Sequence, residues 1–402
     1  MIMDAGHSSL KTISRDTFRR IARDFAATLL PGAVQRDTSG RPLRSEYAAW
    51  GRTGLLTLTI PTDQGGPGLS YPELSEMIQI VAAADGALAQ TAQSHFGTIE
   101  TLRSFGTPEQ REFFFGRILA FDTFGNAQAE AGQKDGGLPS TRLTSKGSDY
   151  ILDGTKLYTT GAFNGDWIRV SAQDDDGNFV FAIVLRETEG IHFTDDWRHF
   201  GQRGTASQTI LFKDVVVLAS HVLRKPEDQP HFTPLLATFQ LTHSAIDIGI
   251  GRGALEAAKD LIRGRTRVPP EALSRGWTRP ADDNHLLVTL GQWEARQHAA
   301  ELLQAHAAQR LHDAVQTLDP GSVAEAAVAV SKAKAFGGDV ALQIATDLFT
   351  FCGASSTRSE LGLDRYWRNL RVHTLHDANW WKYAQVGAYA LDGTAPPVIT
   401  SQ

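Results

Sequence analysis

The chain has 402 residues, of which 42% are hydrophobic and 21% are charged, an ordinary composition for a soluble globular protein. With 39 Lys and Arg against 45 Asp and Glu, the formal net charge is −6, which argues against a nucleic-acid or anionic-membrane partner. A single cysteine, Cys352, excludes an intrachain disulfide, and the absence of a signal peptide or an apolar membrane span predicts a cytoplasmic protein.

Residues 1–120 have the pattern of a helical domain. Apolar residues recur at helical spacing up to the Pro-Gly pair at 31–32: Phe18, Ile21, Phe25 and Leu29. A second helix start is predicted in "GTPEQREFFFGRIL", because Thr107 is a good N-cap and Pro108 suits the first helical position.

Residues 121–233 change to strand-type runs, such as "DYILDGTKLYTTG" and "DWIRVSAQDDDGNFVFAIVL". Asp-Gly pairs at 153–154 and 176–177 predict hairpin turns between them. No helix-length periodic stretch interrupts the strands, so we expect an antiparallel sheet or small barrel rather than parallel strands with crossover helices.

Residues 234–402 return to long Ala- and Leu-rich helices, so the fold class is α+β with a sheet between two helical parts. The fragment "GIGRGA" at 249–254 lacks the third glycine of a dinucleotide-binding loop and does not follow a strand. We interpret it as a site of close helix packing. Cys352, in an apolar run, is likewise interpreted as packing.

The C-terminal stretch "DRYWRNLRVHTLHDANWWKY" at 364–383 gathers arginines, histidines and tryptophans. One interpretation is a solvated basic helix face with aromatic packing. The other is a functional site in which arginines bind phosphate or carboxylate and His376 transfers a proton near neutral pH. His373 and His376 have a spacing that helices use for metal ligands, but without identified carboxylate partners we predict no metal.

Four segments resemble the acyl-CoA dehydrogenase fold and, more specifically, its flavin monooxygenase branch: "DGALAQTAQSHFG", "FGNAQAE", "DDWRHFGQRGTASQT" and "TLHD". Within that branch they are similar to the sulfur-acquisition oxidoreductases, relatives of dibenzothiophene monooxygenase. The resemblance runs from about residue 15 to residue 397. It implies an N-terminal helical domain (1–120), a central antiparallel β domain (121–233) and a C-terminal helical bundle (234–402).

The resemblance also implies residues around a flavin ring. "KLYTTG" matches a dehydrogenase strand whose threonine hydroxyl lies at flavin N5, which places Thr160 there and Tyr158 at the position of a tryptophan. Thr159 belongs to the same cofactor-binding strand, but its side chain is expected to pack. Asn126 and Gln128 are expected to face the ring. Glu130 is kept from the segment that holds flavin and CoA ester, but the Gly-Ser-Asp that follows it is lost, which weakens an acyl-CoA interpretation.

At the C-terminal catalytic position, Arg368, His376 and Asp377 match the arginine, tyrosine and proton-abstracting glutamate of dehydrogenases. Leu-His-Asp is instead the monooxygenase pattern, which makes His376 the expected acid/base group, with Asp377 and Arg368 near the cofactor. His95 matches a second pocket histidine; the alternative is a core histidine with satisfied hydrogen bonds.

Three further positions are implied with less specific roles. Arg265 matches an arginine that reaches the flavin phosphates of a neighbouring subunit, the alternative being a helix-end cation. Trp197 and Ser207 are expected to approach flavin and substrate from the sheet side. Loops 132–140 and 268–284 are expected to contribute pocket walls.

Together these features predict a two-component monooxygenase that oxygenates a small organosulfur compound (a sulfone, sulfide or thiophene) with O₂ through a C4a-hydroperoxyflavin. A separate NAD(P)H-dependent flavin reductase would supply the reduced FMN, and the family implies a homo-oligomer, a tetramer or dimer. The alternatives are an FAD-dependent acyl-CoA dehydrogenase that uses Asp377 as base, and a non-catalytic flavin-binding or assembly protein.

Overall fold

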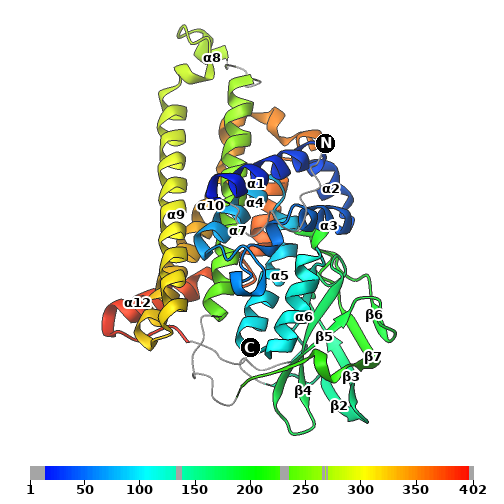
Figure 1. The fold of residues 1–402 in the computed structure, drawn as a ribbon. Helices are drawn as coiled ribbons and strands as arrows, with labels where there is room; N and C mark the ends of the chain where they lie inside the picture. Colours follow the sequence, from blue (N-terminus) through cyan, green and yellow to red (C-terminus); the bar gives the residue numbers. More distant parts are fainter. Residues whose placement is uncertain (1–13, 133–137, 227–234, 265–267, 269, 398–402) are drawn as a thin grey trace.

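The computed structural model describes residues 14–132, 138–226, 235–264, 268 and 270–397. Two groups of helices pack together, and an eight-stranded sheet lies against the N-terminal group (Figure 1). The order helices, sheet, helices is the one expected from the sequence.

The N-terminal helices begin and end where the sequence signals predict. Ser14 caps α1 by accepting from the backbone N–H of Thr17, and Pro31 lies in the 3₁₀ turn that follows the helix. Thr107 and Gln110 form a capping box at the start of α6, which confirms that predicted start. The helices are α1 (Arg15–Leu29), α2 (Ala33–Ser39), α3 (Arg44–Arg52), α4 (Tyr71–Ala84), α5 (Gly86–Phe105) and α6 (Pro108–Leu119).

The sheet has the strand order β6-β7-β3-β2-β4-β5-β8, with β1 beside β4. Five of the pairings are antiparallel, as expected, but β4 pairs in parallel with both β1 and β2. The difference arises because the turns after β3 carry the chain back across the sheet, so β4 runs alongside β1 and β2. The strands are β1 (Phe124–Ala127), β2 (Arg142–Lys146), β3 (Asp149–Lys156), β4 (Trp167–Asp174), β5 (Phe179–Leu185), β6 (Ile191–Phe193), β7 (Ile210–Val217) and β8 (Val222–Arg224).

Of the two Asp-Gly pairs, only one makes a hairpin turn. Gly177, with a φ of 83°, closes the predicted turn between β4 and β5. The hairpin predicted at Asp153-Gly154 is wrong, because this pair lies inside β3 at a register shift against β7. A Cβ on Gly154 would lie 2.3 Å from Thr141 Oγ1, so glycine serves close packing at a bulge here.

The C-terminal helices form a bundle around α7, which packs against α10, α9 and α4 (Figure 1). Two glycines of "GIGRGA" allow α7 to approach α4: a Cβ would lie 2.6 Å from Gln79 O at Gly249 and 2.2 Å from Ala83 O at Gly253. The packing interpretation of this fragment is therefore confirmed. The helices are α7 (Leu235–Gly264), α8 (Pro270–Leu273), α9 (Asn284–Thr317), α10 (Pro320–Cys352), α11 (Asp364–His373) and α12 (Asn379–Asp392).

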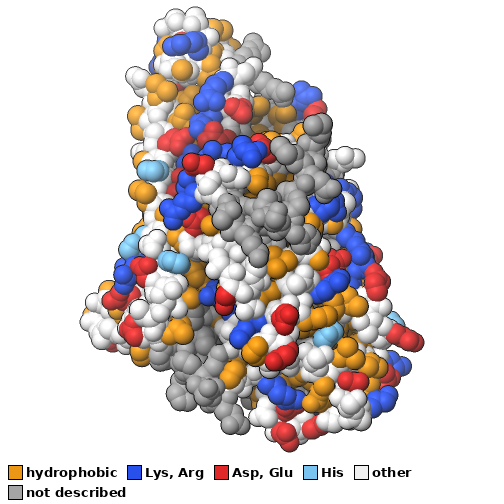
Figure 2. All heavy atoms as spheres, in the orientation of Figure 1, with side chains coloured by type: hydrophobic (Ala, Val, Ile, Leu, Met, Phe, Trp, Pro, Cys, Tyr) orange, Lys and Arg blue, Asp and Glu red, His pale blue; other side chains and the backbone are white. Residues whose placement is uncertain are grey.

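One large core joins the N-terminal helices to the bundle and includes Phe124, Trp167 and Phe181 from the sheet, while a second core lies within the β domain. Cys352 is buried in the large core, and burial raises the pKa of its thiol to about 11, as suits a packing residue. On the face shown in Figure 2, Lys and Arg side chains are interspersed with Asp and Glu side chains. No described helix is long and apolar enough to cross a membrane.

Candidate active site

A chain of three hydroxyl groups lies where the loop after β3 meets the loop before β7. Thr160 Oγ1 is 2.9 Å from Ser207 Oγ, which is 2.8 Å from Thr205 Oγ1. Thr205 in turn donates to the carbonyl oxygen of Gln202 at 2.8 Å. Thr205 and Ser207 are buried, whereas Thr160 is half-buried and forms the open end of the chain.

The direction of these hydrogen bonds follows from chemistry. A carbonyl oxygen only accepts, so the single hydroxyl hydrogen of Thr205 is directed at Gln202. Ser207 must then donate to Thr205, and Thr160 must donate to Ser207. Thr160 therefore presents its lone pairs, and so an acceptor, at the open end.

The two residues before Thr160 face different surroundings. Thr159 is fully buried and its hydroxyl donates to Gln208 O at 2.5 Å, so its side chain packs inside the protein. Tyr158 has a φ of 51° and is 61% exposed. Its ring lies edge-on to Trp197 at 6.2 Å, and Trp197 stacks on His199 at 3.7 Å. These rings form an aromatic surface beside the hydroxyl chain.

Asn126 and Gln128 lie at the end of β1, both half-buried. The backbone N–H of Asn126 donates to Thr160 O at 3.0 Å, which fixes β1 beside the hydroxyl chain. Gln128 Oε1 accepts from Arg169 Nη2 at 3.2 Å. The structure thus brings four of the predicted residues into one region: Asn126, Gln128, Thr160 and Ser207.

Arg169, in the middle of β4, was not predicted. It is fully buried, its Nη1 donates to Gly97 O at 3.1 Å, and its guanidinium lies over the rings of Phe181 and Phe239. Among the described residues no carboxylate pairs with it, and burial lowers the pKa of Arg169 to about 9. An arginine inside the apolar run "DWIRVSA" was the available signal.

A buried ion pair fixes the segment after β1. Lys156 on β3 pairs with Glu130, and its ammonium also donates to Gln128 O at 3.2 Å and to Ser171 Oγ at 2.9 Å. Burial raises the pKa of Glu130, but hydrogen bonds from Lys156, Ser140 and Thr141 outweigh it and lower that pKa to about 2. Burial lowers the pKa of Lys156 to about 8, against the opposing effect of Glu130. Lys156, paired with Glu130, therefore holds the Gln128 backbone in place.

A second candidate region is a histidine cluster between α7 and α11. His373 Nδ1 is 2.6 Å from Asp247 Oδ1, and His373 Nε2 is 3.0 Å from His243 Nδ1. The His243 ring then lies 4.2 Å from that of His376. Asp247, His373 and His243 are buried, but the His376 side chain is 50% exposed.

His243 and Asp247 were not predicted as site residues. Their spacing of four on a helix places them on one face, so this pattern was a usable signal. The sequence suggests His373 only as a possible metal ligand, whereas His376 is also the predicted acid/base group. Within the described residues no group of three or more His, Cys, Asp or Glu could hold a metal ion.

Asp377, beside this cluster, accepts from Gln240 Nε2 at 2.7 Å and lies 3.1 Å from His376 Nδ1. Burial raises its pKa, but the hydrogen bond and charge of His376 and the charge of Lys334 outweigh burial and hold the pKa of Asp377 far below its usual value. Lys334 is fully buried, and its Nζ has no hydrogen-bond partner within the part of the chain that is described.

His95 is fully buried on α5, and backbone groups use both of its ring nitrogens. Nε2 lies 2.9 Å from Leu56 O and therefore donates to it, while the N–H of Phe124 donates to Nδ1 at 3.2 Å. Burial lowers the pKa of His95 to about 4, so the ring is neutral near pH 7. This geometry matches the core-histidine alternative, and a catalytic role for His95 stays a prediction.

Two arginines, Arg368 and Arg265, are predicted at the cofactor. Arg368 pairs with Asp37 and Asp364 and donates to Phe200 O at 2.9 Å, so it holds α11 against the rest of the protein. It also lines a groove of about 720 Å³ together with Trp197. Arg265 lies outside the described residues.

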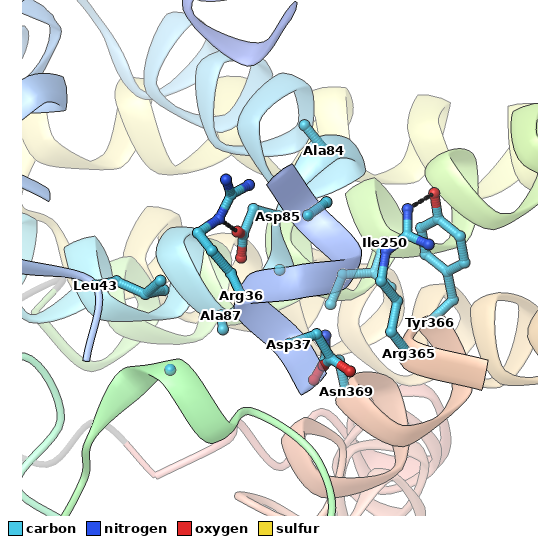
Figure 3. A pocket seen from close by; sticks show the side chains of 13 residues that line it. Arg36, Asp37, Leu43, Ala84, Asp85, Ala87, Ile250, Arg365, Tyr366 and Asn369 are labelled. Carbon is cyan, nitrogen blue, oxygen red and sulfur yellow. Dashed lines mark hydrogen bonds and ion pairs between the residues drawn. The ribbon is translucent and has the colours of Figure 1, made fainter. Parts of the chain in front are cut away.

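A smaller cavity, of about 20 Å³, lies where α2, α5, α7 and α11 meet (Figure 3). The buried pair Arg36–Asp85, 2.8 Å apart, and Arg365 line it. The volume holds about one water molecule, so this cavity is no flavin site.

Comparisons with known proteins match this architecture. Three family models cover most of the chain: the acyl-CoA dehydrogenase N-terminal domain (residues 12–122), middle domain (123–215) and C-terminal domain (241–381). A dibenzothiophene monooxygenase from Mycolicibacterium goodii is 31% identical, with 95% of each chain covered. The chain belongs to the acyl-CoA dehydrogenase family, in its flavin monooxygenase branch.

Two further proteins similar to this chain are described with a flavin. A probable FMNH₂-dependent monooxygenase, SfnC, from Pseudomonas putida is 30% identical, with 94% of this chain and 95% of that protein covered. The crystal structure of TdsC from Paenibacillus sp. A11-2 with FMN and indole is 27% identical, with a TM-score of 0.89 and coverage of 96% of this chain and 99% of that one.

The candidate site has the types of side chain that a flavin ring needs. The half-buried Asn126 amide and Thr160 hydroxyl are polar groups next to the exposed ring of Tyr158. A flavin ring offers polar atoms along one edge and a flat aromatic face, which such groups complement.

Proposed function

We propose that this protein is the oxygenase of a two-component system, which uses reduced FMN and O₂ to oxygenate a small organosulfur compound. The organosulfur class, a sulfone, sulfide or thiophene, is supported by the similarity to dibenzothiophene monooxygenase. FMN is supported by the FMNH₂-dependent relative and the FMN-bound TdsC. A separate NAD(P)H-dependent flavin reductase is the partner that this chemistry requires.

Bound reduced FMN would supply the oxygen transfer, as a C4a-hydroperoxyflavin formed with O₂. The chain's own residues have three tasks: to hold the ring, to exclude water and to manage a proton. Asn126, Gln128, Tyr158 and Thr160 would hold the ring, with the Thr159 backbone beside it. Trp197 and Ser207 would close it from the sheet side, and Arg265 would meet the flavin phosphate of a neighbouring subunit.

The observation that carries the proposal is the direction of the hydroxyl chain. Thr160 presents an acceptor at the open end, because its hydrogen is committed to Ser207. Reduced flavin carries a hydrogen on N5, whereas oxidised flavin has a lone pair there. An acceptor opposite N5 would therefore bind reduced FMN in preference to oxidised FMN, as a system supplied by a separate reductase needs.

His376 would serve as the acid/base group on the other side of the ring. It is the exposed member of the histidine cluster, and its Nδ1 is oriented by Asp377 at 3.1 Å. Arg368 would act by holding α11, which carries His373 of this cluster.

The acyl-CoA dehydrogenase alternative requires a carboxylate that abstracts a proton. Asp377 occupies that position, but His376 and Lys334 hold its pKa far below its usual value, and a weakly basic carboxylate is a poor base. Asp is also one methylene shorter than Glu, which matters for proton abstraction. This charge environment favours the oxygenase. A non-catalytic assembly role leaves the arranged hydroxyls and histidines without a use.

We also propose a homo-oligomer, a tetramer or dimer, that uses α12. None of the described residues of α12 is buried, and its exposed large side chains include Trp380, Trp381 and Tyr383. Exposed aromatic residues are typical of subunit contacts. Light scattering after size exclusion would show a multiple of 43.8 kDa, and Trp381→Glu would reduce it.

A stopped-flow experiment tests the function. Photoreduced FMN and the protein are mixed with oxygenated buffer, and the near-ultraviolet band of a C4a adduct is followed, with a thiophene, a dialkyl sulfide and a dialkyl sulfone as substrates. We expect a long-lived adduct and an oxygenated product from at least one compound. Reduced FMN that oxidises as fast as in buffer, with no product from any compound, would overturn the proposal. Bleaching of bound FAD by an acyl-CoA would establish the alternative.

A further inference from the structure

Three buried side chains behind His376 form a continuous line of hydrogen bonds. Asp247 and His243 lie one helical turn apart on α7, and His373, the last residue of α11, bridges them. Its Nδ1 is 2.6 Å from Asp247 Oδ1 and its Nε2 is 3.0 Å from His243 Nδ1. Asp247 and His373 are 0% exposed and His243 is 3% exposed.

Chemistry fixes where the hydrogens lie in this line. The Asp247 carboxylate accepts, so His373 carries its hydrogen on Nδ1. In the neutral ring Nε2 then accepts, and His243 must donate to it from Nδ1. His243 is thereby fixed in the tautomer that leaves its Nε2 without a hydrogen.

We propose that Asp247, His373 and His243 form a proton relay that receives a proton from the His376 side and stores it on His373. A proton binds to His243 Nε2, the Nδ1–H bond of His243 breaks, and that hydrogen forms a new bond to His373 Nε2. The net result is one added proton, a neutral His243 and an imidazolium at His373 against the Asp247 carboxylate. Its catalytic use rests on the proposed function; the relay itself does not.

The surrounding charges favour storage at His373 over storage at His243. Burial lowers the pKa of His243 well below its usual value, and the positive charges of His376, His373 and Lys334 lower it further, against Asp377. The Asp247 carboxylate is in direct contact with His373 alone of the two rings. Lys382, whose pKa burial also lowers, is a further titratable neighbour of Asp377 and Lys334.

The open side of the relay is at His376. The His243 and His376 rings lie 4.2 Å apart at 32°, and His376 is half exposed. A proton held by His376, the expected acid/base group, has His243 as its next titratable neighbour on the buried side. The two rings pack face to face at a tilt and no hydrogen bond joins them among the described residues, so a bridging water would carry the proton between His376 and His243 Nε2. The relay would then restore or remove that proton from the buried side.

Histidine ¹⁵N NMR of the full chain without flavin tests the relay directly. We expect Nδ1-protonated signals for both His373 and His243 at high pH. On acidification His373 should become doubly protonated before His243. Wild-type protein in which His243 gains the second hydrogen first, or in which His373 is protonated only on Nε2, would overturn the proposal.

Asp247→Asn provides the second measurement, with Asp313→Asn, an exposed residue of α9, as the matched loss of one charge. Removal of the carboxylate should lower the protonation midpoint of His373 by about 1–3 pH units, and Asp313→Asn should not move it. An unchanged midpoint in Asp247→Asn would reduce the line to a structural hydrogen bond. If Asp247→Asn does not fold, the wild-type spectra still decide.

A pH profile separates this proposal from the proposed function. In the oxygenase assay Asp247→Asn should shift the acidic limb of the rate profile, which a purely structural loss would not do. Protein with the expected NMR behaviour but no oxygenase activity would retain the relay and refute the oxygenase. The converse result, oxygenase activity with His243 as the charged ring, would refute the relay alone.

Discussion

The direction of the hydroxyl chain predicts what removal of its middle member does. In Ser207→Ala, Thr160 loses the acceptor for its hydrogen, while the Thr205 contact with Gln202 O at 2.8 Å is retained. The Thr160 hydroxyl is then free to donate as well as to accept. Oxidised FMN, which has a lone pair at N5, would gain a hydrogen bond that the wild-type protein denies it.

The magnitude follows from the net value of one hydrogen bond, about 1 kcal/mol. Oxidised FMN should bind Ser207→Ala about fivefold more tightly than wild type, because 1.4 kcal/mol corresponds to a factor of ten. Reduced FMN should bind about as before, since Thr160 still accepts. The two-electron midpoint potential of bound FMN should therefore fall by about 20 mV.

Fluorescence titration with oxidised FMN and a reductive titration of the complex measure the two quantities. Ser148→Ala, in the exposed turn between β2 and β3, is the matched control and should change neither. If wild-type protein binds oxidised FMN as tightly as reduced FMN, the inference that Thr160 presents a hydrogen-bond acceptor to N5 is refuted. If the ratio of the affinities for oxidised and reduced FMN is unchanged in Ser207→Ala, the chain of hydroxyl groups does not set the preference for reduced FMN.

Three other predictions concern the frame around the site. Glu130→Gln should lower the free energy of unfolding by about 3 kcal/mol at pH 7, because buried Lys156 loses its counter-charge. The folded pKa of Glu130 is about 2, below its unfolded value. In denaturant titrations the difference in stability from wild type should therefore shrink as the pH falls below about 4.3. Gly253→Ala should cost about 1–3 kcal/mol, because its Cβ would meet Ala83 O at 2.2 Å, whereas Gly264→Ala, with open space around it, should be neutral or slightly stabilising. His95→Phe should lower the free energy of unfolding by about 2–4 kcal/mol, because the Leu56 carbonyl and the Phe124 N–H lose their hydrogen-bond partners. A His95→Phe protein that is stable but inactive would instead assign His95 a chemical role.

Local signals in the sequence predicted much of the fold. Helix caps such as Thr107 work through neighbouring backbone groups, so their effect is visible in a few residues of sequence. The parallel pairing of β4 with β1 and β2 depends on contacts between distant segments. The same holds for Asp153-Gly154, where contact with Thr141, rather than local turn preference, requires the glycine.

The site shows the same division. The resemblance singles out Thr160, Ser207 and His376 as expected site residues, since each lies in a short recognisable motif. It did not reveal Asp247 or His243, because their role depends on the meeting of α7 with α11. Nor did it reveal Arg169, whose partners come from α5, the segment after β1, β5 and α7.

Gln202 joins the two parts of the site. Its carbonyl oxygen accepts from Thr205 Oγ1 and from Trp197 Nε1, so one atom anchors both the hydroxyl chain and the aromatic surface. Its backbone N–H and side-chain amide bond to Asn369 on α11 at 2.7 and 3.2 Å. Because α11 also carries His373, the orientation of the sheet-side hydroxyls and the position of the histidine cluster share one buried connection. The hydrogen-bond direction at Thr160 and the tautomer of His243 are thus both fixed by groups that lie behind them, at Gln202 O and at Asp247.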